Sequence, residues 1–253
     1  MSQYETISNK LLQTVRLSWE PVAIKFFKPD DNPGGLMRRS KKLSFCQFVS
    51  AAATGGYTLL VTPENLGCPN ARLAFGFVDP KVDEEAMAKI VKSHVGVYAP
   101  DEASARRIVE AKPSIPPGEV GSIGVTPLGK ANFDPDAVIF TVVPAQAYYI
   151  LDGYLYAEGE VPVRLECGTN SLTCAYGAVV AGYYHRINMV TGCTGGRIYA
   201  GMDGSQVQLF FPGQKLAALL SGLEARSKRV SYPDMPVMPA PIPQPSKHIL
   251  QPE

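Results

Sequence analysis

The chain has 253 residues, of which 45% are hydrophobic, so it can bury a large core in one domain or two. Its formal net charge of +1 excludes a protein that binds nucleic acid through a basic surface. The first ten residues lack an apolar signal segment, and no apolar run is long enough to cross a bilayer. We therefore expect a cytoplasmic protein with no membrane partner.

The first part of the chain is predicted to alternate helices and strands. Ile7, Leu11 and Val15 recur at helical spacing, and Ser44 is placed to cap a helix that carries Cys46 in its first turn. In chain order we expect a helix over 4–17, a strand over 22–27, a helix over 45–55, a strand over 57–61, an extended segment over 73–78 and a helix over 83–95.

Prolines and glycines between residues 113 and 124 mark a crossing between two parts of the chain. Beyond it, Thr169, Asn170 and Ser171 can each cap a second helix of small residues. In chain order we expect strands over 123–128 and 138–143, a helix over 145–157, a strand over 161–166, the small-residue helix near Cys174, strands over 186–190 and 207–211, and a helix over 215–226.

The strands and helices alternate without a regular βαβ rhythm, which favours an α+β or mixed α/β fold. We expect a single globular domain over residues 1–230, in which two pseudo-symmetric halves, about 18–95 and 134–228, pack as one unit. Prolines in the tail over 231–253 exclude a helix or a central strand there. The tail is either a disordered terminus or an arm docked on its own domain or on a second subunit, as in a homodimer, and its apolar residues favour the docked arm.

The two halves are predicted from a repeated pattern of cysteines, glycines and arginines. In each copy a cysteine opens a segment of small residues, and a Gly-Cys-x-x-x-Arg-x-x-x-Gly run follows. The paired cysteines are 22 residues apart in the first copy and 19 in the second. The matched positions are Cys46, Gly67, Cys68, Arg72 and Gly76 in the first copy, and Cys174, Gly192, Cys193, Arg197 and Gly201 in the second.

These cysteines carry the chemistry that the sequence suggests. Five cysteines are too few, and odd in number, for a disulfide scaffold. Cys46 and Cys174 are expected in the first turns of helices, where the helix dipole stabilises a thiolate. Cys68 and Cys193 are expected in tight glycine turns. If all four meet between the halves, they suit an iron–sulfur cluster, foremost [4Fe–4S], or zinc. Alternatively they are buried thiols with no metal.

Other residues give weaker indications. Arg72, Arg197, Gly195 and Gly196 are candidates for binding a small anionic ligand or the sulfurs of a cluster. As structural residues, the two arginines would pair with acids such as Asp79 or Asp203. The fifth cysteine, Cys167, is expected in a strand or in the core. His94 and His185 are expected at the surface or at strand ends, and no hydrolase triad, zinc-protease motif or phosphate loop can be assembled.

As a set, several short motifs resemble the prokaryotic family called domain of unknown function 169, or ArCR. They are residues 19–23, 46–47, 66–69, 143–147, Cys174 and residues 192–197. The resemblance covers most of the chain up to about Lys228 and excludes the tail. It implies one full-length domain, a prokaryotic cytoplasmic setting and this pattern of cysteines, but no reaction.

We accordingly expect an iron–sulfur protein in which Cys46, Cys68, Cys174 and Cys193 hold the cluster. It would act in electron transfer, sensing or small-molecule activation, with a redox partner protein or a small anionic molecule. One alternative is a module that binds a small anionic ligand, with structural cysteines. The other is a thiol-redox enzyme that uses Cys46 or Cys174 as its nucleophile.

Overall fold

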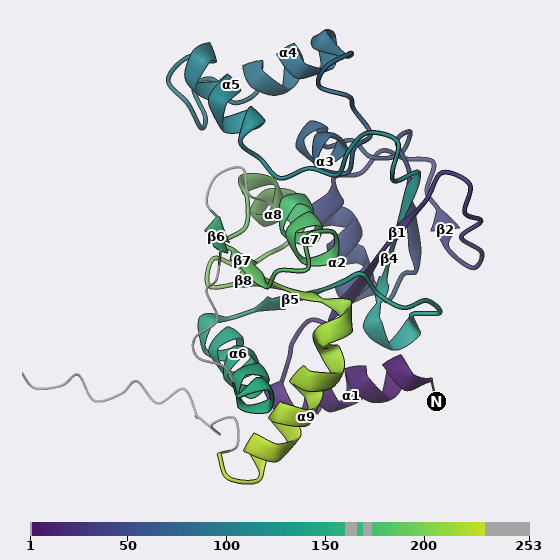
Figure 1. Ribbon diagram of the computed structural model, residues 1–253, viewed down its shortest axis with the longest axis vertical. Helices are drawn as coiled ribbons and strands as arrows, with labels where there is room; N and C mark the ends of the chain where they lie inside the picture. Colours follow the sequence, from purple (N-terminus) through teal and green to yellow (C-terminus); the bar gives the residue numbers. More distant parts are fainter. Residues whose placement is uncertain (1, 160–165, 169–173, 231–253) are drawn as a thin grey trace, which may run out of the picture.

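The computed structural model describes residues 2–159, 166–168 and 174–230. Its strands form one mixed sheet in the order β2-β3-β4-β1-β5-β8-β7-β6 (Figure 1). The strands are β1 (Val22–Phe27), β2 (Met37–Arg38), β3 (Leu59–Val61), β4 (Ser122–Pro127), β5 (Ala137–Val142), β6 (Glu166–Gly168), β7 (Asn188–Val190) and β8 (Val207–Pro212).

The order of antiparallel and parallel strand pairs is the same on both sides of the centre of the sheet. β1 and β5 are antiparallel neighbours in the middle. Outward from β1 come β4, β3 and β2, and outward from β5 come β8, β7 and β6. The outermost pairs, β2–β3 and β6–β7, are parallel, and the remaining neighbours are antiparallel.

Helices cover both faces of this sheet, which makes three layers (Figure 1). Alternate residues of a strand serve the two cores, as the two-residue period of a strand requires: Ile24 packs with one cluster and Ala23 with the other. One face carries α2 (Phe45–Gly55), α3 (Pro69–Ala74), α7 (Cys174–Gly182) and α8 (Thr194–Tyr199), and the other carries α1 (Gln3–Val15), α6 (Pro144–Glu158) and α9 (Leu216–Ser227).

The small residues of α7 let it lie directly on the sheet. A Cβ added at Gly177 would be 2.5 Å from the Phe210 ring, and one at Gly182 would be 2.7 Å from the Phe26 ring. All residues of α7 are buried. The bare face of this helix therefore accommodates phenylalanine rings of the sheet.

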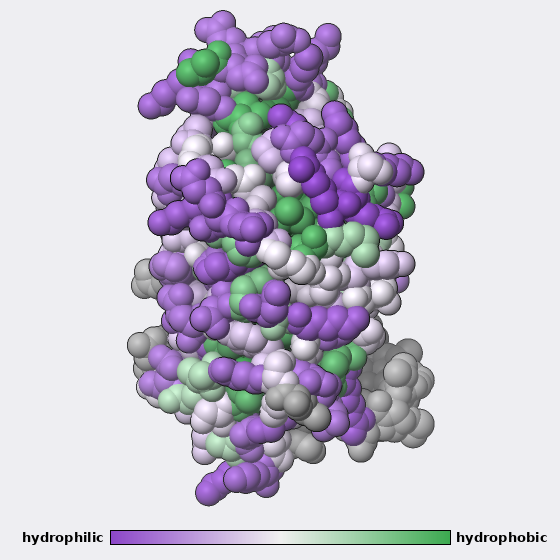
Figure 2. Space-filling model, turned by 90° about the vertical axis from the view of Figure 1, so that its right-hand side faces the viewer, coloured by the Kyte–Doolittle hydropathy of each residue, from purple (hydrophilic) through white to green (hydrophobic). Residues whose placement is uncertain are grey.

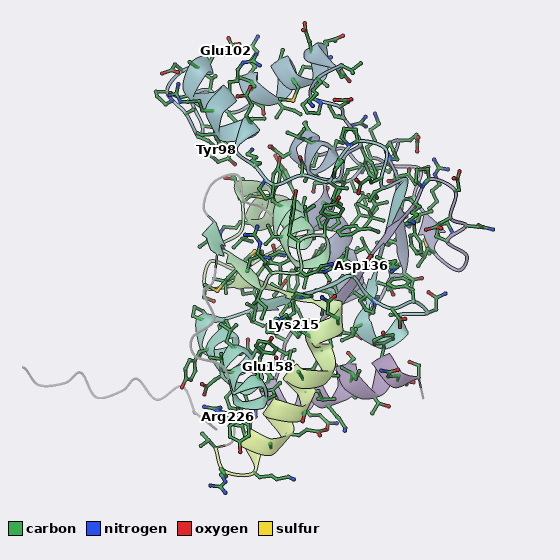
Figure 3. The ribbon with its side chains drawn as sticks, viewed as in Figure 1. Tyr98, Glu102, Asp136, Glu158, Lys215 and Arg226 are labelled. Carbon is green, nitrogen blue, oxygen red and sulfur yellow. The ribbon has the colours of Figure 1, made fainter. Side chains whose placement is uncertain are left out.

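Two glycines likewise bring α6 and α9 into contact on the opposite face. A Cβ added at Gly222 would be 1.8 Å from the carbonyl oxygen of Gly153, so the two backbones touch. Arg226, labelled in Figure 3, links the last turn of α9 to α6. Its guanidinium forms an ion pair with Asp152 and lies 4.6 Å from the centroid of the Tyr149 ring.

The helices α4 (Glu84–Lys92) and α5 (Glu102–Glu110) form a hairpin that projects beyond the sheet, at the end away from α1 and α9 (Figure 1). Its own small core contains Met87, Ile90 and Val109, and Leu73 of α3 joins this core. The hairpin is therefore anchored to the layer that carries the cysteines.

Hydrophilic residues cover most of the face seen in Figure 2, and hydrophobic residues reach that surface in smaller groups. Within the described part of the chain, no helix is long and apolar enough to span a membrane.

The structure confirms the mixed α/β class and most of the predicted elements. The extended segment expected over 73–78 is wrong, because Pro69 starts the short helix α3 and the chain leaves it at Gly76, with a φ of 71°. Helix α5 was not predicted. Most of the strand expected over 161–166, the capping residues Thr169, Asn170 and Ser171, and the tail over 231–253 lie outside the described residues.

Candidate metal centre

Cys46 and Cys174 stand at the beginnings of the two long helices of their layer. Cys46 is the second residue of α2, which Ser44 caps, and the Ser44 backbone N–H donates to Gln47 Oε1 at 2.9 Å. The Ser44 hydroxyl lies 3.0 Å from Cys46 Sγ. Cys174 is the first residue of α7. Both placements agree with the prediction from the sequence.

Cys68 and Cys193 are the capping residues of α3 and α8. The Gly196 N–H donates to Cys193 Sγ at 3.3 Å, whereas the Cys68 side chain makes no such capping hydrogen bond. The sequence predicted a tight turn at these positions. The structure differs, because each glycine–cysteine pair opens a short helix.

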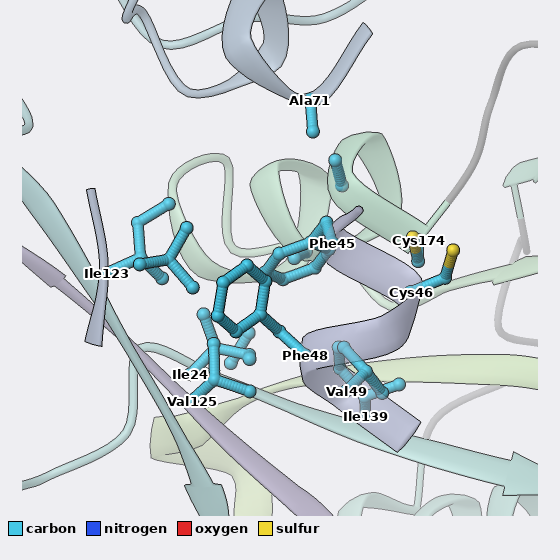
Figure 4. Packing of buried hydrophobic residues seen from close by; sticks show 14 of the residues in the cluster. Ile24, Phe45, Cys46, Phe48, Val49, Ala71, Ile123, Val125, Ile139 and Cys174 are labelled. Atoms are coloured by element: carbon cyan, nitrogen blue, oxygen red, sulfur yellow. The ribbon is translucent and has the colours of Figure 1, made fainter. Parts of the chain in front are cut away.

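The four thiols gather from both halves of the chain. Cys46 and Cys193 both border Gly195, where an added Cβ would lie 3.9 Å from Cys46 Sγ and 3.7 Å from Cys193 Sγ. Figure 4 shows the sulfurs of Cys46 and Cys174 side by side. Cys68 lies within electrostatic range of the other three. The helices are crossed accordingly, because α8 packs against α2 and α3 packs against α7. Each capping cysteine thus approaches the long helix of the other half.

The environment keeps all four thiols protonated near neutral pH. The hydrogen bond to Cys174 raises the pKa of Cys46 to about 12, and burial raises that of Cys68 to about 11. The hydrogen bond to Cys46 raises the pKa of Cys193. For Cys174 the hydrogen bond from Cys46 lowers the pKa, but burial and the charges of Cys193 and Cys68 outweigh it, so the pKa is raised.

Gly195 and Gly196 border the sulfurs. A Cβ added at Gly195 would lie 3.7 Å from Cys193 Sγ and 3.9 Å from Cys46 Sγ, and one at Gly196 would lie 3.9 Å from Cys193 Sγ. The structure therefore brings these two predicted site residues to the cysteines, where they contribute backbone and no side chain.

Comparison with known proteins identifies the family. The family model for DUF169, described as uncharacterised ArCR, matches residues 10–222. The chain belongs to the DUF169 family. "Uncharacterized protein MJ0308" of Methanocaldococcus jannaschii is 26% identical to the DUF169 chain over 220 residues, which are 86% of this chain and 92% of that protein. No solved structure matches the chain.

The two arginines of the DUF169 chain donate to backbone carbonyls of neighbouring loops. Arg72 donates to the Pro63 carbonyl at 2.5 Å. Arg197 donates to the carbonyls of Thr191 and Asp203, both at 2.5 Å. Neither arginine makes the carboxylate pair considered from the sequence, and Arg197 reaches the backbone rather than the side chain of Asp203. Anion binding by these arginines stays a prediction.

A buried polar group beside Cys68 was not predicted from the sequence. Lys112, 8% exposed, donates to Asn70 Oδ1 at 2.8 Å and lies 2.7 Å from His94 Nε2. Its ammonium also lies 5.2 Å from the centroid of the Tyr176 ring. The expectation that His94 is at the surface is wrong, because its side chain, in the connection between α4 and α5, is fully buried. His185 is exposed, as expected.

The four thiols do not form a ready-made metal site, and the cavity of the DUF169 chain lies elsewhere. Among the residues that the structure describes, no three His, Cys, Asp or Glu side chains form a group that could hold a metal ion as they stand. A cavity of about 420 Å³ next to Lys25 and Asp136 contains none of the predicted site residues.

Proposed function

We propose that Cys46, Cys68, Cys174 and Cys193 hold an iron–sulfur cluster, [4Fe–4S], in a protein that transfers electrons. The observation that carries this proposal is the contact of Cys46 with thiols from the other half of the chain. Four thiolates are the ligand set of [4Fe–4S] and [2Fe–2S] clusters and of structural zinc sites.

The surroundings of the thiols suit an anionic centre. The positive ends of α2 and α7 face Cys46 and Cys174, and they favour the thiolates that a metal requires. The Gly196 N–H donates to Cys193 Sγ, as backbone hydrogen bonds to cluster sulfurs do. A metal would replace the thiol protons and supply the positive charge that the buried sulfurs lack.

Symmetry supports the placement of this centre between two related halves. The strand order reads the same outward from β1 and from β5, and α2 and α3 occupy positions that correspond to those of α7 and α8. The contacts of α2 with α8 and of α3 with α7 are equivalent under the same relationship. We infer a duplicated unit whose two copies each contribute two of the four ligands.

The two alternative functions have less support. A nucleophilic thiol needs a lowered pKa, whereas burial and thiol–thiol hydrogen bonds raise the pKa values here. A small anionic ligand would need free guanidinium groups, whereas Arg72 and Arg197 already donate to backbone carbonyls.

Electron transfer is favoured because two of the cysteines are partly exposed and exposed basic residues lie near them. Cys68 and Cys193 are partly exposed, so an electron has a short path to the outside. Arg39, Lys41 and Lys42 are exposed on the segment that leads to Cys46. A Cβ added at Gly67, next to Cys68, would lie 3.5 Å from Lys42 Cβ. These three residues, Arg39, Lys41 and Lys42, form a basic rim, and an acidic redox partner would be attracted to it.

Anaerobic purification with iron and sulfide analysis tests the proposal. The protein should be brown and contain iron and inorganic sulfide, and Cys193→Ala should lose both along with the visible absorption. Cys167→Ala, which removes the fifth cysteine, is the matched control and should keep them. Zinc without sulfide would leave a cysteine site but exclude electron transfer. A colourless, metal-free protein of normal stability would refute the metal site.

The close spacing of the thiols makes it necessary to distinguish a single zinc ion from an iron–sulfur cluster. A single zinc ion with Zn–S bonds of about 2.3 Å holds neighbouring sulfurs about 3.8 Å apart. A cluster of four irons is larger, so the thiols would have to separate as it binds. The ratio of iron to sulfide to protein therefore decides between the two metals.

A further inference from the structure

The polar group beside Cys68 breaks the correspondence between the two halves. Between α3 and β4 the chain inserts the α4–α5 hairpin, whereas α8 leads to β8 through the short connection 200–206. Lys112 follows directly after the hairpin, and His94 lies between its two helices. One of the four cysteine positions thus has neighbours that the other three do not have.

The contacts of Lys112 are those of an ammonium group. His94 Nδ1 lies 2.7 Å from the Ile90 carbonyl, so Nδ1 carries the hydrogen and Nε2 is left as an acceptor. Lys112 can then donate one hydrogen to His94 Nε2, one to Asn70 Oδ1 and one toward the Tyr176 ring. Three donors meet three acceptors, and the cation is held in a fixed place.

The ammonium has no carboxylate to balance its charge in these contacts. Burial lowers the pKa of Lys112 to about 7, and a negative charge on Cys68 opposes that shift. A buried cation that is held by neutral groups is expensive unless an anion lies near it. Cys68 as a metal-bound thiolate is such an anion.

Tyr176 supplies a second unexplained polar atom at the same place. Its side chain is fully buried, and its hydroxyl has no hydrogen-bond partner among the described residues. Burial raises the pKa of Tyr176, and a negative charge on Cys68 raises it further, so the hydroxyl keeps its proton. An unpaired buried donor of this kind calls for an acceptor.

We propose that Lys112 and Tyr176 are positioning residues of the metal centre at Cys68. The Lys112 ammonium offsets the negative charge of the bound centre, and the Tyr176 hydroxyl donates a hydrogen bond to a sulfur of that centre. Both effects stabilise the more reduced form, so they raise the reduction potential and strengthen metal binding. This inference rests on the proposed function, because it needs a metal at the four cysteines.

Anaerobic redox titration of the iron–sulfur protein tests the inference. Tyr176→Phe removes one oxygen atom from the core, and Lys112→Met removes the charge. Each should shift the midpoint potential to a more negative value with unchanged iron and sulfide content, whereas Lys112→Arg should shift it less than Lys112→Met. Tyr184→Phe and Lys89→Met, which change exposed side chains, are the controls and should leave it unchanged.

Cobalt(II) binding to the metal-free protein gives a second readout. Tyr176→Phe and Lys112→Met should each weaken Co²⁺ binding by about tenfold or more, measured from the thiolate-to-cobalt absorption. If wild type binds metal and Tyr176→Phe matches it in both potential and affinity, the inference is wrong and the proposed function stands. If wild type takes up neither a cluster nor Co²⁺, the proposed function fails and this inference fails with it.

Discussion

The sulfurs of Cys46, on α2, and Cys193, which caps α8, both border Gly195: a Cβ added there would lie 3.9 Å from Cys46 Sγ and 3.7 Å from Cys193 Sγ. These residues are far apart in sequence and belong to different halves of the chain. The partner that shares a copy of the repeat with Cys46 is Cys68, which reaches it only through the electrostatic field. The thiols are therefore brought together by packing between the two parts of the chain, α2 with α8 and α3 with α7, rather than within each part.

Mild oxidation of the metal-free protein should reveal this arrangement directly. We expect the first disulfide to join Cys46 to Cys193 or to Cys174, because these thiols are already in contact. Peptide mapping by mass spectrometry after brief treatment with an oxidant identifies the pair. A first disulfide between Cys46 and Cys68 would contradict the crossed arrangement.

The metal-free protein should lose stability in alkaline solution. The folded state raises the pKa of Cys46 to about 12 and that of Cys68 to about 11, from the ordinary thiol value of 9.0. Below pH 9 both states keep these protons, and above it the unfolded thiols ionise first, so unfolding is favoured as the pH rises through 11 and 12. Urea unfolding from pH 8 upward measures this loss.

The control for the pH experiment is a protein without the two groups. A Cys46→Ala, Cys68→Ala double variant should lose less stability than wild type over the same pH interval. Equal losses in the two proteins would assign the effect to tyrosines and lysines that also titrate there.

Tyr176→Phe should not destabilise the metal-free protein. The hydroxyl has no partner among the described residues, so its removal relieves an unpaired buried group. We expect a change between zero and a gain of about 1–2 kcal/mol in the free energy of unfolding. Chemical denaturation of both proteins without metal is the measurement. A loss of more than about 1 kcal/mol would mean that the hydroxyl already has a partner.

Gly222→Ala should weaken the contact between α6 and α9. The new methyl group would lie 1.8 Å from the Gly153 carbonyl oxygen, so the helices must separate. We expect a loss of about 3 kcal/mol or more in the free energy of unfolding, as for overpacked cores. Ser221→Ala, at an exposed position on the same helix, should cost nothing. Thermal unfolding that gave the same midpoint for both variants would contradict the close packing.

Charge reversal at the basic rim should slow electron transfer to an acidic carrier. A Lys41→Glu, Lys42→Glu variant would repel a negatively charged partner and lower its rate of association. Stopped-flow reduction of an acidic ferredoxin at several salt concentrations measures the effect. We expect a difference from wild type that is largest at low salt, whereas a difference independent of salt would argue against electrostatic steering.

The sequence predicted the parts of this site that depend on local signals. The Ser44 cap, the position of Cys46 in its first turn and the central strands all follow from spacing and capping rules. Helix α3 was missed because the apolar run over 73–78 outweighed a shorter signal, the cysteine cap followed by Pro69 at the first helical position.

Contacts between distant segments were beyond such reasoning. Lys112 contacts Asn70, which is 42 residues earlier in the chain, and His94, which is 18 residues earlier. Only the docking of the hairpin brings these three residues together. The same holds for the pairing of cysteines. The repeat suggested that four thiols meet, but it contained no information on which thiol lies beside which, because that depends on how α2, α3, α7 and α8 pack.

The crossed packing of α2 with α8 and of α3 with α7 constrains how such a protein could arise. A chain of half this length would carry two cysteines whose nearest ligand partners belong to another copy. Under the proposed function, such a half could acquire a metal only as a dimer, with the metal at the subunit interface. Joining the two halves in one chain would, under the same proposal, make metal loading independent of protein concentration.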